Sequence, residues 1–216
     1  MLLYRPVGLE ELRLVYQARM TAFPPRLPDQ PIFYPVTNAA YATHIARDWN
    51  TRSGTKGGFV TRFVVSDSYV SKFERRVVGA KEHEELWVPA EELAELNSHI
   101  EGRIEVIGAY FGEGYRGEIA DAPGLVGEDA HEQFVGLART LAHSPFDAVR
   151  ELAVNHVAVF LNFLLWEHED FAADGFDSES RAELLGALKR VWAESESHGT
   201  IPLGVAVTTT TATAFA

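Results

Sequence analysis

Residues 23–49 read FPPRLPDQPIFYPVTNAAYATHIARDW. The first eleven of these residues include four prolines, and a proline interrupts a helix because it lacks an amide donor and restricts the residue before it. We therefore predict an irregular loop, followed by a strand over Ile32–Val36. Apolar side chains four residues apart then predict a helix through Trp49, with Thr37 or Asn38 as its N-cap. A strand that leads directly into a capped helix is typical of a domain that mixes both kinds of structure.

The segments on both sides of this stretch also alternate between short strands and short helices. Upstream, residues 2–5 are predicted to form a strand, and residues 9–19 carry apolar side chains at helical spacing. The elements predicted downstream are strands over 59–65, 86–88 and 104–111, a helical turn over 69–73 and a helix over 89–98. Short helices and hairpin-like loops between strands favour an α+β fold over a doubly wound parallel sheet.

A glycine-rich stretch, GEGYRGEIADAPGLVG at residues 112–127, separates two halves that differ in charge. It has no apolar periodicity, so we predict a linker with the boundary near Ala120. Residues 1–117 carry 14 Lys and Arg against 15 Asp and Glu, whereas residues 118–216 carry 5 against 16. We expect the following division: an α+β domain over 1–117, a linker over 118–127, an acidic helical domain over 128–205 and a frayed tail over 206–216.

The second half is predicted to be mainly helical, because apolar residues recur there at helical spacing. The three predicted helices cover residues 128–142, 145–169 and 178–197. Asp177 or Ser178 is expected to cap the third helix, and Gly199 with Pro202 marks its end.

The composition excludes several classes of protein. The chain has 216 residues and no cysteine, which excludes disulfides, thiolate zinc sites and a cysteine nucleophile. The net charge of −12 argues against nucleic acid and anionic membranes as partners. The most apolar run, 154–166, is shorter than the roughly 20 residues that cross a bilayer. Since the N-terminus also lacks the pattern of a secretory signal, we expect a cytoplasmic protein.

Common catalytic and metal-binding motifs are missing. The sequence has no GxxxxGK[ST] and no GxSxG. Glu167, His168 and Asp170 are close in sequence, but neighbouring positions of a helix point to different faces. We therefore expect no metal site there.

Three segments, in chain order, carry a resemblance to known proteins: LYR at 3–5, FYPVTNAAYA at 33–42 and EELWVP at 84–89. This set resembles the ADP-ribosyltransferase-like fold, in which an Arg or His on the first strand binds the dinucleotide, a Ser, Thr or Tyr follows on a strand before a helix, and a later glutamate performs catalysis. Longer stretches resemble a bacterial family labelled ADP-ribosylation/crystallin J1: LYRPVGLEEL, AFPPRLPDQPIFYPV, YATHIARDWNT, GFVTRF and ELWVPAEEL, all within residues 1–111.

The resemblance implies that NAD is the substrate, and it suggests which residues would bind the phosphates, the ribose and the nicotinamide of NAD. Arg5 would contact the phosphates or ribose of NAD, since its planar fork suits bidentate phosphate binding. Thr37 would occupy the polar strand position, although the usual Ser-Thr-Ser pattern is absent. Tyr34 or Tyr41 would stack on the nicotinamide, or both are half-buried core aromatics. Arg26 is either a phosphate contact or a loop charge held by Asp29.

The same resemblance implies that Glu85, directly before a strand, is the catalytic carboxylate, with Glu84 as the alternative. Its task would be to hold a ribose hydroxyl and to stabilise positive charge at the anomeric carbon as nicotinamide leaves. His83 is a candidate acid or base, because a neighbouring carboxylate can move the titration of a histidine through neutral pH. The alternative for these three residues is an exposed polar turn.

Two functions remain open from the sequence. The first is an NAD-dependent ADP-ribosyltransferase that modifies an unknown acceptor. The second is a non-catalytic module of the same fold that binds a nucleotide or a partner protein, with the acidic helical half as a partner surface or an inhibitory surface.

Overall fold

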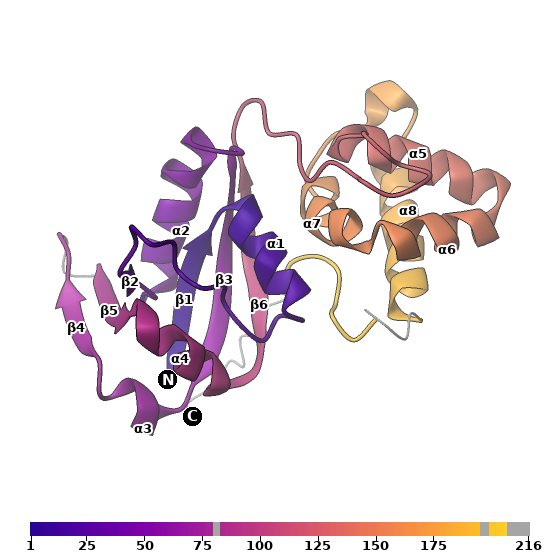
Figure 1. Ribbon diagram of the computed structural model, residues 1–216. Helices are drawn as coiled ribbons and strands as arrows, with labels where there is room; N and C mark the ends of the chain where they lie inside the picture. Colours follow the sequence, from indigo (N-terminus) through magenta and orange to yellow (C-terminus); the bar gives the residue numbers. More distant parts are fainter. Residues whose placement is uncertain (80–82, 195–198, 207–216) are drawn as a thin grey trace, which may run out of the picture.

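The computed structural model describes residues 1–79, 83–194 and 199–206. Its first part is a mixed α+β domain with small antiparallel sheets, which confirms the predicted fold class (Figure 1). The larger sheet has the order β1 (Leu2–Val7), β3 (Gly57–Val65), β6 (Ile100–Phe111), and the smaller sheet has the order β2 (Ile32–Phe33), β5 (Glu84–Pro89), β4 (Glu74–Val77).

Val36 joins the two sheets. It lies just beyond β2 and forms antiparallel bridges to Tyr4 of β1 on one side and to Glu85 of β5 on the other. The amide of Tyr4 donates to the carbonyl of Val36 over 2.8 Å, and the amide of Val36 donates back over 2.8 Å. The strands therefore follow one another in the order β4, β5, β2, β1, β3, β6, with the break between β2 and β1.

Two helices cover the two faces of the larger sheet. Figure 1 shows α2 (Ala39–Asp48) on one side and α1 (Leu9–Gln17) on the other. The central strand β3 is accordingly buried on both faces over residues 57–61, which explains its run of apolar residues and glycines. Gly58 allows α2 to pack directly against β3, because a Cβ at this position would lie 1.9 Å from the carbonyl oxygen of Ala46.

Asn38, rather than Thr37, caps α2. Its side-chain oxygen accepts hydrogen bonds from the amides of Ala40 and Tyr41, at 2.7 and 3.2 Å. The remaining short helices of this domain are η1 (Asn50–Arg52), α3 (Asp67–Val70), η2 (Ala90–Glu92) and α4 (Leu93–Ser98).

The second part is helical, with α5 (Ala130–His143), α6 (Pro145–Val154), α7 (His156–Trp166), η3 (Ala172–Asp174) and α8 (Ser178–Ala193). The single helix predicted over 145–169 is wrong, because the chain bends by 103° between α6 and α7. Asn155 lies at the bend, and its amide group donates to the carbonyls of Glu151 and Pro123, at 3.0 and 3.1 Å. Pro123 belongs to a distant loop, so a tertiary contact stabilises the break.

Within the described residues, no single helix is long and apolar enough to cross a membrane, although the bent pair α6 and α7 meets the criteria of length and composition together. Most residues of α7 are buried inside the protein.

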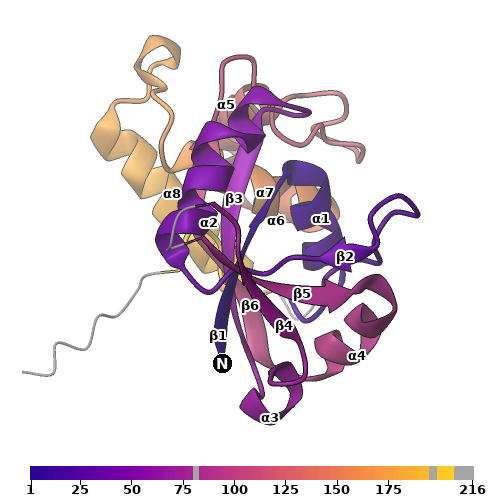
Figure 2. The same ribbon diagram turned by 90° about the vertical axis from the view of Figure 1, so that its left-hand side faces the viewer.

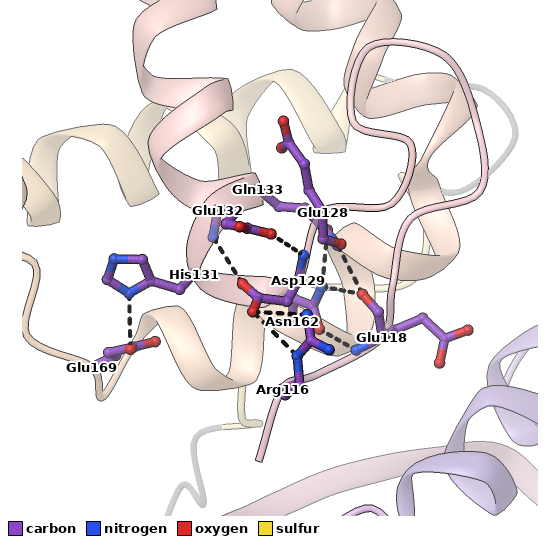
Figure 3. Close-up of polar contacts among 9 residues, drawn as sticks. All are labelled: Arg116, Glu118, Glu128, Asp129, His131, Glu132, Gln133, Asn162 and Glu169. Carbon is purple, nitrogen blue, oxygen red and sulfur yellow. Dashed lines mark hydrogen bonds and ion pairs between the residues drawn. The ribbon is translucent and has the colours of Figure 1, made fainter. Parts of the chain in front are cut away.

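A polar network holds the linker onto the helices (Figure 3). Asn162 of α7 is fully buried and accepts a hydrogen bond from the amide of Glu118 over 2.8 Å. Its amide group donates to the carbonyl of Glu118 and to the side-chain oxygen of Gln133, at 2.8 and 2.9 Å. Asp129 caps α5 in a reciprocal capping box with Glu132.

The chain returns to the first domain after α8. The amide of Ala206 donates to the carbonyl of Val106 in β6 over 2.7 Å, and Arg103 binds the hydroxyl of Thr200 over 3.1 Å. Ile201 is buried, and its carbonyl accepts a hydrogen bond from the indole of Trp192 over 2.6 Å. Most of the predicted tail, 207–216, lies outside the described residues.

Candidate functional site

The pairing across the sheets determines which candidate residues share a face. Tyr4, Val36 and Glu85 are paired in succession, and side chains of paired residues point to the same face of a sheet. Residues one position away, such as Arg5 and Glu84, point to the opposite face. Glu85 lies on the face that also carries α2, as its contact with Tyr41 of that helix shows.

Tyr41 orients the carboxylate of Glu85. Its hydroxyl donates to Oε1 of Glu85 over 3.0 Å. Tyr41 is 5% exposed, and burial together with this hydrogen bond and the charge of Glu85 raises the pKa of Tyr41 to about 12. The phenol therefore remains a proton donor at neutral pH. Glu85 itself is half-buried, so its carboxylate is both positioned and within reach of a ligand.

Two histidines extend this cluster. The ring of His83 stacks on Tyr41 with 4.1 Å between the centroids and 10° between the planes. His44, one turn further along α2, lies 6.3 Å from His83 and is nearly parallel to it. Nδ1 of His44 is 2.8 Å from a carboxylate oxygen of Asp48. Three planar rings thus lie in a row beside the carboxylate of Glu85.

The neighbouring part of the same face is formed by Trp87, two residues along β5. Tyr34 packs its edge against Trp87, with 5.2 Å between the ring centroids. The guanidinium of Arg76 in β4 lies 3.8 Å from the centroid of the Trp87 ring, and it also donates to Glu74 over 2.6 Å. Figure 2 shows this side of the molecule, with α2 and the smaller sheet toward the viewer.

Arg5 lies apart from this cluster. It is 8% exposed, and its Nε and terminal nitrogen donate to the two carboxylate oxygens of Glu11, at 2.7 and 3.2 Å. A third bond reaches the carbonyl of Tyr34, and the guanidinium lies 4.5 Å from the Phe33 ring centroid. Arg5, which was predicted to bind phosphate, is thus hydrogen-bonded to Glu11 and to the carbonyl of Tyr34, on the opposite face of the sheet from Glu85.

Arg26, in the proline-rich loop, lies near Arg5 and Glu11 rather than near Glu85. Its terminal nitrogens lie near Glu11, at 4.0 Å, and Gln30, at 2.5 Å. Burial, and then the charge of Arg5, lower the pKa of Arg26, with Glu11 acting in the opposite direction. Of the two interpretations made from the sequence, this arrangement favours the loop charge, with Glu11 rather than the predicted Asp29 as the carboxylate in its ion pair.

Thr37 and Glu84 meet through the backbone. The amide of Thr37 donates to the carbonyl of Glu84 over 3.2 Å, which continues the ladder between the β2 segment and β5. Because Glu84 precedes Glu85 in a strand, its side chain points to the other face. The structure therefore brings together four of the predicted residues, namely Tyr34, Tyr41, His83 and Glu85.

Sequence reasoning missed Trp87 and Arg76 on this face, and His44 in the neighbouring row of rings. Trp87 follows Glu85 by two positions in a predicted strand, and the alternation of side chains alone was a sufficient signal. Arg76 had no such signal, because the exposed strand β4 was not predicted. Its four residues, ERRV, lack the apolar alternation that marks a half-buried strand.

Among the residues that the structure describes, in either half of the chain, no group of three or more His, Asp or Glu side chains could hold a metal ion. His131 lies between Glu169 and Asp174, with each ring nitrogen 3.0 Å from one carboxylate. Figure 1 shows helices α5 to α8 on the side of the larger sheet that carries α1, away from β4 and β5. The acidic half therefore does not lie over the face of Glu85.

Comparisons with protein-family models, with curated proteins and with solved structures found no match for this chain.

Proposed function

We propose that this protein is an NAD-dependent ADP-ribosyltransferase-like enzyme, and that Glu85 is its catalytic carboxylate. One observation carries the proposal: Glu85 is half-buried, is oriented by the hydroxyl of Tyr41 at 3.0 Å, and shares its sheet face with the aromatic rings of Tyr34, His83 and Trp87. A fixed carboxylate beside flat apolar surfaces suits a substrate with a ribose next to a planar base.

The arrangement around Glu85 supports the chemistry of nicotinamide release. Tyr41 holds one carboxylate oxygen, and within the described residues the other oxygen has no hydrogen bond. That oxygen is available to accept a hydrogen bond from a ribose hydroxyl. The negative charge would stabilise the positive charge that develops at the anomeric carbon as the bond to nicotinamide breaks. The acceptor would then take the ADP-ribose group.

The topology supports an ADP-ribosyltransferase-like fold as part of this proposal. The three segments that carry the resemblance lie in β1, at the end of the β2 segment and in β5, and they are direct neighbours through Val36. Residues more than 40 positions apart in the sequence, such as Tyr41 and Glu85, meet as a result. This neighbourhood is what a site built from those three segments requires.

Release of nicotinamide from NAD tests the proposal. The protein, with and without cell extract as a source of acceptor, is compared with Glu85→Gln, which keeps the shape of the side chain and removes its charge. We expect at least a 100-fold lower rate for this variant, because the loss of one well-placed charge costs about 3 kcal/mol of transition-state stabilisation.

Glu84→Gln is the matched control, because it removes the same charge from the adjacent position on the opposite face. It should retain the rate of the unmodified protein. Release that is insensitive to Glu85→Gln, or equally sensitive to both substitutions, would contradict the assignment of Glu85.

The position of Arg5 favours a second candidate, a non-catalytic module that binds a nucleotide or a partner protein. Arg5 is tied to Glu11 on the opposite face, so the proposed site lacks the first-strand arginine that the resemblance implies. Such a module would bind ADP-ribose without releasing nicotinamide from NAD. Measuring binding and release on the same preparation distinguishes the two candidates.

A further inference from the structure

We infer that Arg76 binds the phosphate groups of a nucleoside diphosphate whose ribose is held at Glu85. This inference rests on the proposed function for the placement of the ribose, and it adds a phosphate-binding residue that lies outside the three segments of the resemblance. Arg76 belongs to β4, the edge strand of the smaller sheet.

The register of β4 and β5 places Arg76 beside Glu85. The two residues are direct partners across the strands, as are Glu74 and Trp87. Cβ atoms of direct partners in an antiparallel pair are about 5 Å apart, and opposite charges at such positions commonly interact. Here no ion pair joins Arg76 to Glu85 in the described structure. Arg76 donates to Glu74 on its own strand, and Glu85 accepts from Tyr41.

The consequence is a separated pair of charges on one open face. The cation of Arg76 lies over Trp87, while the anion of Glu85 is held on the other side by Tyr41. A ligand that carries a hydroxyl group a few ångströms from a phosphate would match both. A ribose 5′-phosphate has this arrangement, and the diphosphate of a nucleoside diphosphate extends it along the strand.

Arg76 also has donors to spare. Its side chain is 44% exposed, and Glu74 accepts from one terminal nitrogen at 2.6 Å. A guanidinium has five N–H donors in a planar fork, which matches the oxygens of a phosphate. Stacking on Trp87 fixes the plane of that fork before the ligand arrives, so less side-chain freedom is lost on binding.

Trp87 adds to the same region a polar group without a partner among the described residues. Its indole N–H is buried and has no hydrogen-bond partner in the described structure. Buried donors in native proteins are normally satisfied, and an exception calls for an explanation. The same small region thus has a stacked cation, an oriented carboxylate and an unused donor.

The test is the affinity for ADP-ribose, measured by calorimetry at low ionic strength. The proteins are the unmodified chain, Arg76→Ala and Arg75→Ala. Arg75 is the matched control, because it is adjacent in β4 but pairs with Leu86, points to the other face and contacts Met1. Both substitutions remove one positive charge from the same strand, so only position separates them.

We expect Arg76→Ala to bind ADP-ribose at least 10-fold more weakly, and Arg75→Ala to bind it as the unmodified protein does. Adenosine, which lacks phosphates, should bind all three proteins equally. No binding of ADP-ribose by the unmodified protein, or equal affinity of the two variants, would overturn the inference. If nicotinamide release is absent but Arg76→Ala still weakens ADP-ribose binding selectively, the proposed catalysis fails and the phosphate site stands.

Discussion

Replacing Asn162 by alanine is expected to destabilise the helical half strongly. Asn162 is fully buried and makes three hydrogen bonds within 3.0 Å, two to the backbone of Glu118 and one to the side chain of Gln133. After the substitution, the carbonyl of Glu118 keeps a hydrogen bond from Gln133 at 2.8 Å. The amide of Glu118 and the side-chain oxygen of Gln133 lose the partners they have in the structure.

The magnitude follows from these two unsatisfied groups. A buried polar group without a partner costs about 1–3 kcal/mol, so we expect the free energy of unfolding to fall by about 3 kcal/mol. With a denaturant slope of about 2 kcal/mol/M, the urea midpoint should fall by roughly 1.5 M. Asn162 also holds the linker, so proteolysis within residues 112–127 should become faster.

Urea unfolding followed by tryptophan fluorescence measures the effect, because Trp166 and Trp192 are buried in the helical half. Asn50→Ala is the control, since the side chain of Asn50 makes no hydrogen bond among the described residues and its loss should change stability by less than about 0.5 kcal/mol. A decrease below about 1 kcal/mol for Asn162→Ala, or equal to that of the control, would refute the account of the network.

Two further substitutions test other parts of the structure. Gly58→Ala should lower the free energy of unfolding by about 2–3 kcal/mol, because the new Cβ would lie 1.9 Å from the carbonyl oxygen of Ala46. Thermal or urea unfolding measures this change. A free energy of unfolding within about 0.5 kcal/mol of the original value would contradict the close approach of α2. Burial lowers the pKa of His131, but the hydrogen bonds and charges of Glu169 and Asp174 outweigh this effect and raise the pKa overall. The stabilisation by protonated His131 is therefore complete below its unfolded pKa of about 6.5 and is lost as the pH rises through the folded pKa. His131→Asn should consequently lower the free energy of unfolding most near pH 6 and least near pH 9. A loss of stability that does not depend on pH would contradict this account.

Much of the first domain was predictable because its signals are local. Four prolines between residues 23 and 33 exclude a helix whatever surrounds them, and the helix after Asn38 has both its cap and its apolar spacing within a few residues. The alternation of strands and helices followed from the same kind of pattern. These features depend on backbone chemistry and periodicity, which each segment carries by itself.

The bend at Asn155 was not predictable in this way. The apolar spacing continues from α6 into α7, and Asn155 occurs where a continuous helix would tolerate a polar residue. The bend depends on the contact of its side chain with Pro123, which is 32 positions away. The edge strand β4 was missed for a similar reason, since all four of its residues are exposed and it exists by pairing with β5.

The candidate site also depends partly on local sequence signals and partly on contacts between distant segments. The sequence by itself determined that Arg5 and Glu85 lie in or directly before strands, and that Tyr41 lies in a helix. Only the tertiary structure decided which of them meet, because a shift of one residue in a strand moves a side chain to the other face. The pairing of Val36 with Tyr4 and Glu85 put Glu85 beside Tyr41 and turned Arg5 toward Glu11, and that register is set by contacts between distant segments of the chain.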